Sequence, residues 1–114
     1  MTPKPKEEIK EMSRLLHTVG TKTFIKYFFH FKDEASFEEM NEVFKRNGES
    51  WKESSCRTKI TNGKRIFRKE YEFDALYYII NIVNENKIGF DTKIRAEEIY
   101  DEYIKKGSQY INQY

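Results

Sequence analysis

Basic, hydroxyl and amide side chains are concentrated in one stretch, residues 50–69, with the sequence SWKESSCRTKITNGKRIFRK. Residues 52–69 hold seven lysines and arginines against one glutamate, a net charge of +6, whereas the whole chain carries only +2. Cationic groups bind phosphates or carboxylates, and hydroxyl and amide groups exchange hydrogen bonds with base edges or polar protein atoms. The chemistry that this stretch predicts is non-covalent binding of a polyanion.

The spacing within the stretch predicts one long helix over residues 51–69. Ser50 followed three residues later by Glu53 is the signature of a capping box, which places the start of the helix at Trp51. One stripe of this helix should face a core, and it consists of Cys56, Ile60, Gly63 and Phe67. Because Gly63 has no side chain, another backbone should be able to approach the helix closely there. The candidate binding residues occupy the other faces: Lys52, Ser54, Arg57, Thr58, Lys59, Thr61, Asn62, Lys64, Arg65, Arg68 and Lys69.

The sequence contains no motif for catalysis or for a metal centre. Cys56 is the only cysteine, so there is no intramolecular disulfide and no cysteine-based metal cluster, and we expect a buried thiol. The two histidines, His17 and His30, lack the spacing of metal ligands. Adjacent carboxylates, such as Glu97 and Glu98, point about 100° apart on a helix and therefore do not converge as acid and base. We expect no enzyme activity, no cofactor and no metal.

Apolar residues at helical spacing predict further helices before the basic stretch. The first helix runs from Glu7 and ends at Gly20, a glycine at the position of a left-handed C-cap. An aromatic helix follows over residues 21–33, with a core stripe formed by Phe24, Tyr27, Phe28 and Phe31. The next helix, residues 37–46, begins with a capping box at Ser36 and ends at Asn47 and Gly48.

Two more elements are expected after the basic stretch. Residues 70–86 form the most apolar part of the chain, and we favour a helix there; a short strand near residues 77–83 is the alternative. The apolar surplus of this element is a candidate homodimer surface, through Tyr77, Ile79 and Ile82, or a core contacted on two sides. A final helix, capped by Asp91 or Thr92, should end at Gly107 and expose an acidic face. The fold class predicted is all-α, a compact domain of five or six helices.

Three of the predicted helices, over residues 21–33, 37–46 and 51–69, resemble in architecture the tri-helical core of helix-turn-helix DNA-binding domains. That family often carries a small residue four positions before the turn glycine, whereas this chain has Phe44 before Gly48. The resemblance implies that the helix over residues 51–69 enters the major groove of double-stranded DNA. Arg57 would then read guanine and Asn62 adenine, while Lys59, Lys64, Arg65, Arg68 and Lys69 would meet phosphates.

The expected organisation is a flexible lead over residues 1–6, a single helical domain over residues 7–107 with a tri-helical core over residues 21–69, and a tail over residues 108–114. The N-terminus lacks the apolar core of a signal peptide, and no apolar run approaches the ~18 residues of a membrane span. We therefore expect a cytoplasmic protein with no membrane partner.

Two functions lead from the sequence, and a third, a structural subunit that oligomerises through residues 77–83, is open beside them. The first is a small DNA-binding protein, a regulator or accessory factor, that binds through the basic helix. The second is a protein-interaction module, such as a phage-encoded inhibitor of a host nucleic-acid enzyme, that docks the same basic face on an acidic protein surface.

Overall fold

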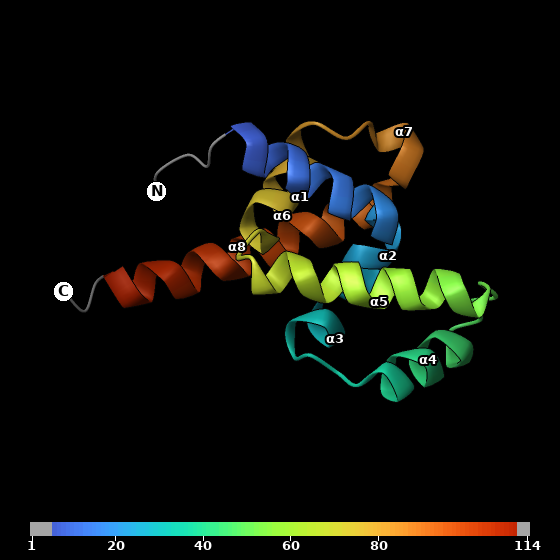
Figure 1. The fold of residues 1–114 in the computed structure, drawn as a ribbon. Coiled ribbons are helices and arrows are strands. Elements are labelled where there is room, and N and C mark those ends of the chain that lie inside the picture. The colour runs from blue at the N-terminus through green and yellow to red at the C-terminus, as the bar shows by residue number, and fades with distance from the viewer. Residues whose placement is uncertain (1–5, 112–114) are drawn as a thin grey trace.

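The computed structural model describes the backbone of residues 6–111 and the side chains of residues 6–103. These residues form eight helices and no strand (Figure 1), which confirms the predicted all-α class. The helices are α1 (Lys6–Val19), α2 (Thr21–Lys26), α3 (Phe28–Lys32), α4 (Phe37–Arg46), α5 (Glu53–Arg68), α6 (Glu72–Asn81), α7 (Glu85–Ile88) and α8 (Phe90–Ile111). The alternative of a strand near residues 77–83 is wrong, because α6 covers most of that segment, and the chain has more helices than the five or six expected.

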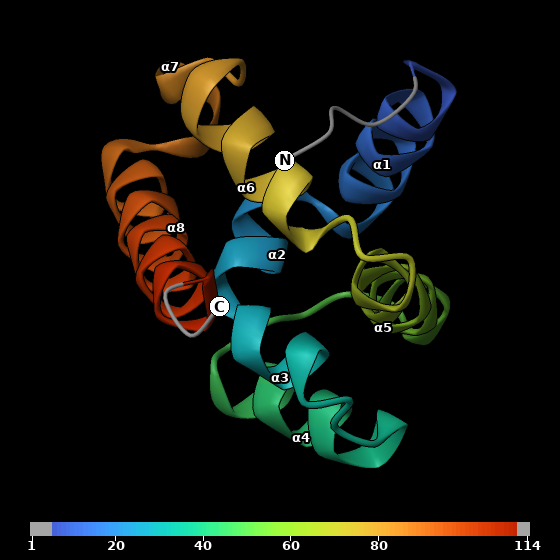
Figure 2. The same ribbon diagram turned by 90° about the vertical axis from the view of Figure 1, so that its left-hand side faces the viewer.

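One hydrophobic core joins all eight helices. In Figure 2, α2 lies near the centre of the molecule, with α1 and α5 on one side and α8 on the other. The most extensive helix contact is that of α1 with α5, followed by that of α6 with α8. Each helix contributes at least one fully or nearly fully buried apolar side chain to this core: Met12, Phe24, Phe28, Met40, Ile60, Leu76, Ile88 and Ile99.

The predicted aromatic helix over residues 21–33 is interrupted at Tyr27, where α2 ends and α3 begins. In one straight helix, Phe24, Tyr27, Phe28 and Phe31 would share a face, while Ile25 would point away from it. The break lets the structure bury all five side chains in the core. The width of the apolar surface, rather than a helix-breaking residue, therefore explains the interruption.

Helix α4 begins and ends as the sequence predicts. The hydroxyl oxygen of Ser36 accepts a hydrogen bond of 3.1 Å from the amide of Glu39. At the other end, Gly48 has a φ of +79°, its N–H donates to the carbonyl of Lys45, and that of Glu49 donates to Phe44. This pair of bonds is a Schellman motif, which explains why a glycine follows the helix.

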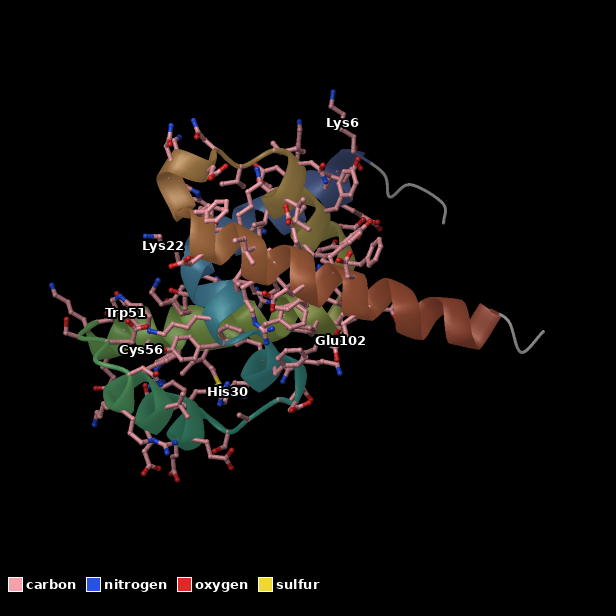
Figure 3. All side chains as sticks on the ribbon, turned by 180° about the vertical axis from the view of Figure 1, so that it is seen from behind. Lys6, Lys22, His30, Trp51, Cys56 and Glu102 are labelled. Carbon is pink, nitrogen blue, oxygen red and sulfur yellow. The ribbon has the colours of Figure 1, made fainter. Side chains whose placement is uncertain are left out.

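Helix α5 begins two residues later than the capping box predicted. Lys52 is the N-cap, and no side chain caps the helix there, so the expected role of Ser50 is wrong. The segment before α5 is extended at Lys52, and the ring of Trp51 packs against Phe44 with 5.2 Å between centroids. The packing of this partly buried ring beside α4, near the buried thiol of Cys56 (Figure 3), therefore accounts for the later start of the helix.

The C-terminal elements correct two further expectations. Ile79 is fully buried in the core, so it cannot belong to a free dimer surface, whereas Tyr77 and Ile82 are exposed. Helix α8 continues through Gly107 to Ile111, so that glycine does not end it. Of the predicted terminal segments, residues 1–5 and 112–114 lie outside the described part of the chain.

The arrangement around α5 bears on the helix-turn-helix resemblance. Six residues, 47–52, connect α4 to α5, and the contact between these two helices is slight compared with the contact of α1 with α5. The helix that supports α5 along most of its length therefore comes from outside residues 21–69. The tri-helical core remains a prediction.

Candidate nucleic-acid interface

The candidate interface is the solvent-facing side of α5, which lies at the margin of the molecule between α1 and α4 (Figure 2). A helix turns about 100° per residue, so polar side chains three and four positions apart line one face. The centre of this face carries side chains that are all exposed: Ser54, Arg57, Thr58, Thr61, Arg65 and Arg68. The sequence therefore predicted correctly which side of the helix faces solvent, although it did not predict what borders that side.

Helix α1 borders one edge of the face. The side-chain amide of Asn62 donates a hydrogen bond of 2.8 Å to the hydroxyl of Thr18. Just beyond the end of α5, the ammonium of Lys69 and the hydroxyl of Tyr71 both donate to the carboxylate of Glu11. These two hydrogen bonds hold the pKa of Glu11 below its usual value. Burial and the bond to Glu11 raise the pKa of Tyr71 to about 12.

The segment from α3 to α4 borders the opposite edge. Arg68 donates to the carboxylate of Glu34, with 2.6 Å between Nε and Oε1. Arg57 lies 3.6 Å from the carboxylate of Glu53 and places its guanidinium over the ring of Phe37, at 5.2 Å from the centroid. The edges of the interface are therefore held in place by carboxylates and a ring, which orient the cations and offset part of their charge.

Lys59 lies outside this face, although the resemblance implied a contact with phosphate. Its ammonium donates a hydrogen bond of 2.8 Å to the carbonyl of Val19 and lies 4.6 Å from the ring centroid of Trp51. Burial lowers the pKa of Lys59. This lysine therefore links the C-terminus of α1 to α5 and stabilises the packing of the two helices.

Lys64 and Arg65 are the cations of α5 that remain available. Within residues 6–103, neither makes an ion pair or a cation–π contact, and the same is true of Lys52 at the start of the helix. Arg65 is exposed at the centre of the face, and Lys64 is half-buried at its edge. Arg65 and Lys64 can therefore bind an anion without first breaking an ion pair or a cation–π contact within residues 6–103.

Arg14 extends the basic surface onto α1, and sequence reasoning missed it. Along α1 it lies between Glu11 and Thr18, at i+3 and i−4, so it shares the side of α1 that contacts Lys69 and Asn62. Its side chain is exposed. The sequence does show that Glu11, Arg14 and Thr18 would share one side of a predicted helix. That side can be assigned to the basic surface only once α1 is known to lie along α5.

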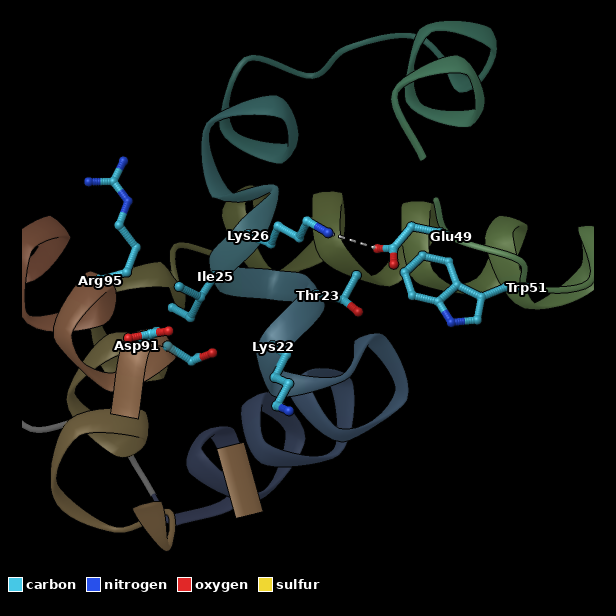
Figure 4. A pocket seen from close by; sticks show the side chains of 9 residues that line it. Lys22, Thr23, Ile25, Lys26, Glu49, Trp51, Asp91 and Arg95 are labelled. Carbon is cyan, nitrogen blue, oxygen red and sulfur yellow. Dashed lines mark ion pairs between the residues drawn. The ribbon is translucent and has the colours of Figure 1, made fainter. Parts of the chain in front are cut away.

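A second feature lies on the other side of the segment that leads into α5. A groove of about 450 Å³ lies between α2, residues 49–51 and the start of α8, and Figure 4 shows the side chains that line it. Lys26 pairs with Glu49 across it at 3.7 Å, and Glu49 also accepts a 2.9 Å hydrogen bond from Tyr27. The groove contains both signs of charge and internal partners, and its side chains point in different directions. It does not form a convergent binding site.

The described residues contain no group of three or more His, Cys, Asp or Glu side chains placed to hold a metal ion. Among the same residues, no helix combines the length and apolar character needed to cross a bilayer. Protein-family models, curated proteins and solved structures yield no match to this chain. The exposed face of α5 is therefore the feature of this chain that bears on its function.

Proposed function

We propose that this protein binds double-stranded DNA through the exposed face of α5, as a regulator or accessory factor. The observation that carries the proposal is the gathering of Lys64 and Arg65, free of acidic partners in the described residues, with exposed hydroxyl groups on one 16-residue helix at the margin of the molecule. Arg65 and Lys64 would contact phosphates, which supply affinity without sequence information. Ser54, Arg57, Thr58 and Thr61 are the side chains of this face nearest the helix start, where recognition helices meet base edges.

The first test is the salt dependence of binding to a fluorescein-labelled random duplex, followed by anisotropy. For about five phosphate contacts, raising salt from about 50 mM to about 200 mM should weaken binding on the order of 10²- to 10³-fold. The double variant Lys64→Ala/Arg65→Ala should bind at least about tenfold more weakly and should show a salt slope smaller by about 2.

The chain offers a matched control for this variant. Lys45 and Arg46 form a second Lys-Arg pair on a helix, both are exposed, and neither makes an ion pair among the described residues. Lys45→Ala/Arg46→Ala removes the same charge and should leave DNA affinity nearly unchanged. An equal loss in both double variants would show that net charge, and not the face of α5, determines binding.

The alternative partner is an acidic protein surface, such as that of a nucleic-acid enzyme inhibited by this chain. The observation in its favour is that Arg68 and Lys69 already bind carboxylates, those of Glu34 and Glu11. A pull-down from nuclease-treated lysate separates the two functions. Recovery of one stoichiometric protein, lost in Lys64→Ala/Arg65→Ala and retained in the control variant, together with no binding to the duplex, would replace the DNA proposal.

A further inference from the structure

The side of the molecule opposite α5 has a different chemistry. Helix α8, which Figure 2 shows across the core from α5, exposes four residues at spacings of four, three and four: Phe90, Ile94, Glu97 and Asp101. Phe90 is 63% exposed, which is unusual for a large apolar side chain. From the neighbouring helix α6, Tyr77 adds a ring that is 52% exposed. The α6–α8 surface thus combines aromatic and acidic side chains.

A hollow of about 350 Å³ lies in this surface between the two helices. Its lining consists of Tyr77, Ile80, Asn81, Glu97, Tyr100 and Asp101. The rings of Tyr77 and Tyr100 lie 6.4 Å apart at an interplanar angle of 47°. Phe73 stacks on Tyr100 with 4.8 Å between centroids and so supports that ring from α6. The hollow therefore has two aromatic side chains held on the folded helices.

The two carboxylates of the hollow are free to accept a cation. Glu97 and Asp101 make no ion pair within residues 6–103, in contrast to Glu98, which pairs with Arg95 at 3.2 Å. Like charges one helical turn apart repel each other, so a cation placed between them relieves that repulsion. The amide nitrogen of Asn81 donates to the carbonyl of Tyr77 at 3.0 Å, which leaves its oxygen as a further acceptor.

We propose that the hollow between α6 and α8 binds an arginine side chain from a basic segment of a partner protein. A planar guanidinium stacks on aromatic rings and forms paired hydrogen bonds with carboxylates, and both groups line this hollow. Ile94 and Phe90 lie one and two turns nearer the start of α8 than Glu97, and they offer an apolar surface to a neighbouring side chain of the same segment. Charge complementarity thus favours a basic partner for the α6–α8 surface. The basic face of α5, on the other side of the molecule, favours an anionic partner.

The test uses a fluorescein-labelled peptide, Gly-Arg-Gly-Leu-Gly-Arg-Gly, and its counterpart with citrulline in place of both arginines. Citrulline keeps the shape of arginine but carries no charge. The full chain should bind the arginine peptide at least about tenfold more tightly than the citrulline peptide, because two rings and two carboxylates stabilise the cation. Amide shifts in ¹H–¹⁵N spectra should change in α6 and α8.

The variant Glu97→Gln/Asp101→Asn should abolish this preference while leaving DNA affinity unchanged. Glu38 and Glu42 on α4 are exposed carboxylates at the same spacing, so Glu38→Gln/Glu42→Gln is the matched control and should retain the preference. The proposal is overturned if the chain does not distinguish the two peptides, if both double variants lose the preference equally, or if the shifts fall outside α6 and α8.

A second copy of the chain is the competing occupant, since its α5 face is basic. Sedimentation equilibrium of the chain alone should give a monomer. A dimer that dissociates in Glu97→Gln/Asp101→Asn would assign the surface to self-association and overturn the proposal. Failure of the DNA experiment would not affect this result, because the peptide binding and the DNA binding use opposite sides of the molecule.

Discussion

The ring of Phe31 occupies the space that a side chain at Gly63 would fill. A Cβ built on Gly63 would lie 2.5 Å from two ring carbons of Phe31 and 2.8 Å from a third. The sequence suggested that Gly63 admits the close approach of another backbone, whereas the group that approaches is an aromatic ring from α3. This contact fixes the position of α5 against α3 and hence the side of α5 that faces solvent.

The contact predicts the effect of adding one methyl group. Gly63→Ala should lower the free energy of unfolding by about 1–3 kcal/mol, because the gain in helix propensity is smaller than the cost of the clash. Urea unfolding followed by circular dichroism measures the loss. In the double variant Gly63→Ala/Phe31→Leu, the combined loss should be smaller than the sum of the two single losses. Thr61→Ala, at an exposed position of the same helix, should change stability by no more than about 0.5 kcal/mol.

Substitutions at Lys59 and Arg65 should have opposite effects: one should lower stability and the other should weaken DNA binding. Lys59→Ala removes a hydrogen bond from a charged donor to the Val19 carbonyl and a contact with the Trp51 ring, and should cost about 1–2 kcal/mol of unfolding free energy. Its DNA affinity, measured where the variant is fully folded, should match that of the wild type. Arg65→Ala should show the opposite pattern. Weaker DNA binding by folded Lys59→Ala would contradict the assignment of this lysine to the fold.

Glu70 predicts a stabilising substitution. This residue follows α5 with a φ of +59°, a conformation that costs a side-chain-bearing residue about 1–2 kcal/mol. The N–H groups of Glu70 and Tyr71 donate to the carbonyls of Phe67 and Ile66, as in a Schellman motif. Glu70→Gly should therefore raise the free energy of unfolding by about 0.5–1 kcal/mol.

Glu34 provides the comparison for Glu70→Gly. It follows α3 with a φ of +52°, but its carboxylate also binds Arg68. Glu34→Gly relieves the same backbone strain and removes that ion pair, so its gain should be smaller. If Glu70→Gly lowers the unfolding temperature, strain at this position does not limit stability.

Glu11 predicts how stability changes with pH. Its pKa is lowered in the folded state by the hydrogen bonds from Lys69 and Tyr71, so the ionised carboxylate stabilises the fold. That contribution is complete above the ordinary pKa of 4.5 and is lost as pH falls through the lowered folded-state value. Between about pH 6.5 and about pH 3.5, the wild type should lose more unfolding free energy than Glu11→Gln does. Glu42→Gln, at an exposed position of α4, should retain the wild-type pH dependence.

Periodicity and glycine positions were sufficient to predict much of the fold. The helical class, the limits of α4 and the burial of Cys56, Ile60 and Gly63 on α5 follow from the spacing of apolar residues and from Ser36 and Gly48. The predicted stripe was incomplete, because Ile66 is also fully buried and Phe67 is only partly buried. The break at Tyr27 and the late start of α5 do not follow from the local sequence. The break lets the wide apolar surface of residues 24–31 pack into the core, and Trp51 before α5 packs on Phe44, so both depend on partners that only the folded chain supplies.

The sequence was sufficient to predict which side chains make up the candidate site, but not which of its cations are already bound to other residues of the chain. Helical geometry correctly placed Ser54, Thr58 and Arg65 on the solvent side of α5. The acidic partners Glu11 and Glu34 are distant in sequence from α5, so a charge count over residues 52–69 could not include them. The engagement of Lys59 by Val19, 40 residues earlier in the chain, was hidden for the same reason.

The pairing of α1 with α5 has a consequence for synthesis of the protein. The bonds from Asn62 to Thr18 and from Tyr71 to Glu11 join residues 44 and 60 positions apart. While the ribosome makes the chain, α1 lacks its most extensive contact until α5 has been synthesised, which takes several seconds at ~5–20 residues per second. The nascent chain therefore carries a helix whose apolar side is only partly covered, by α2, until its main packing partner is made.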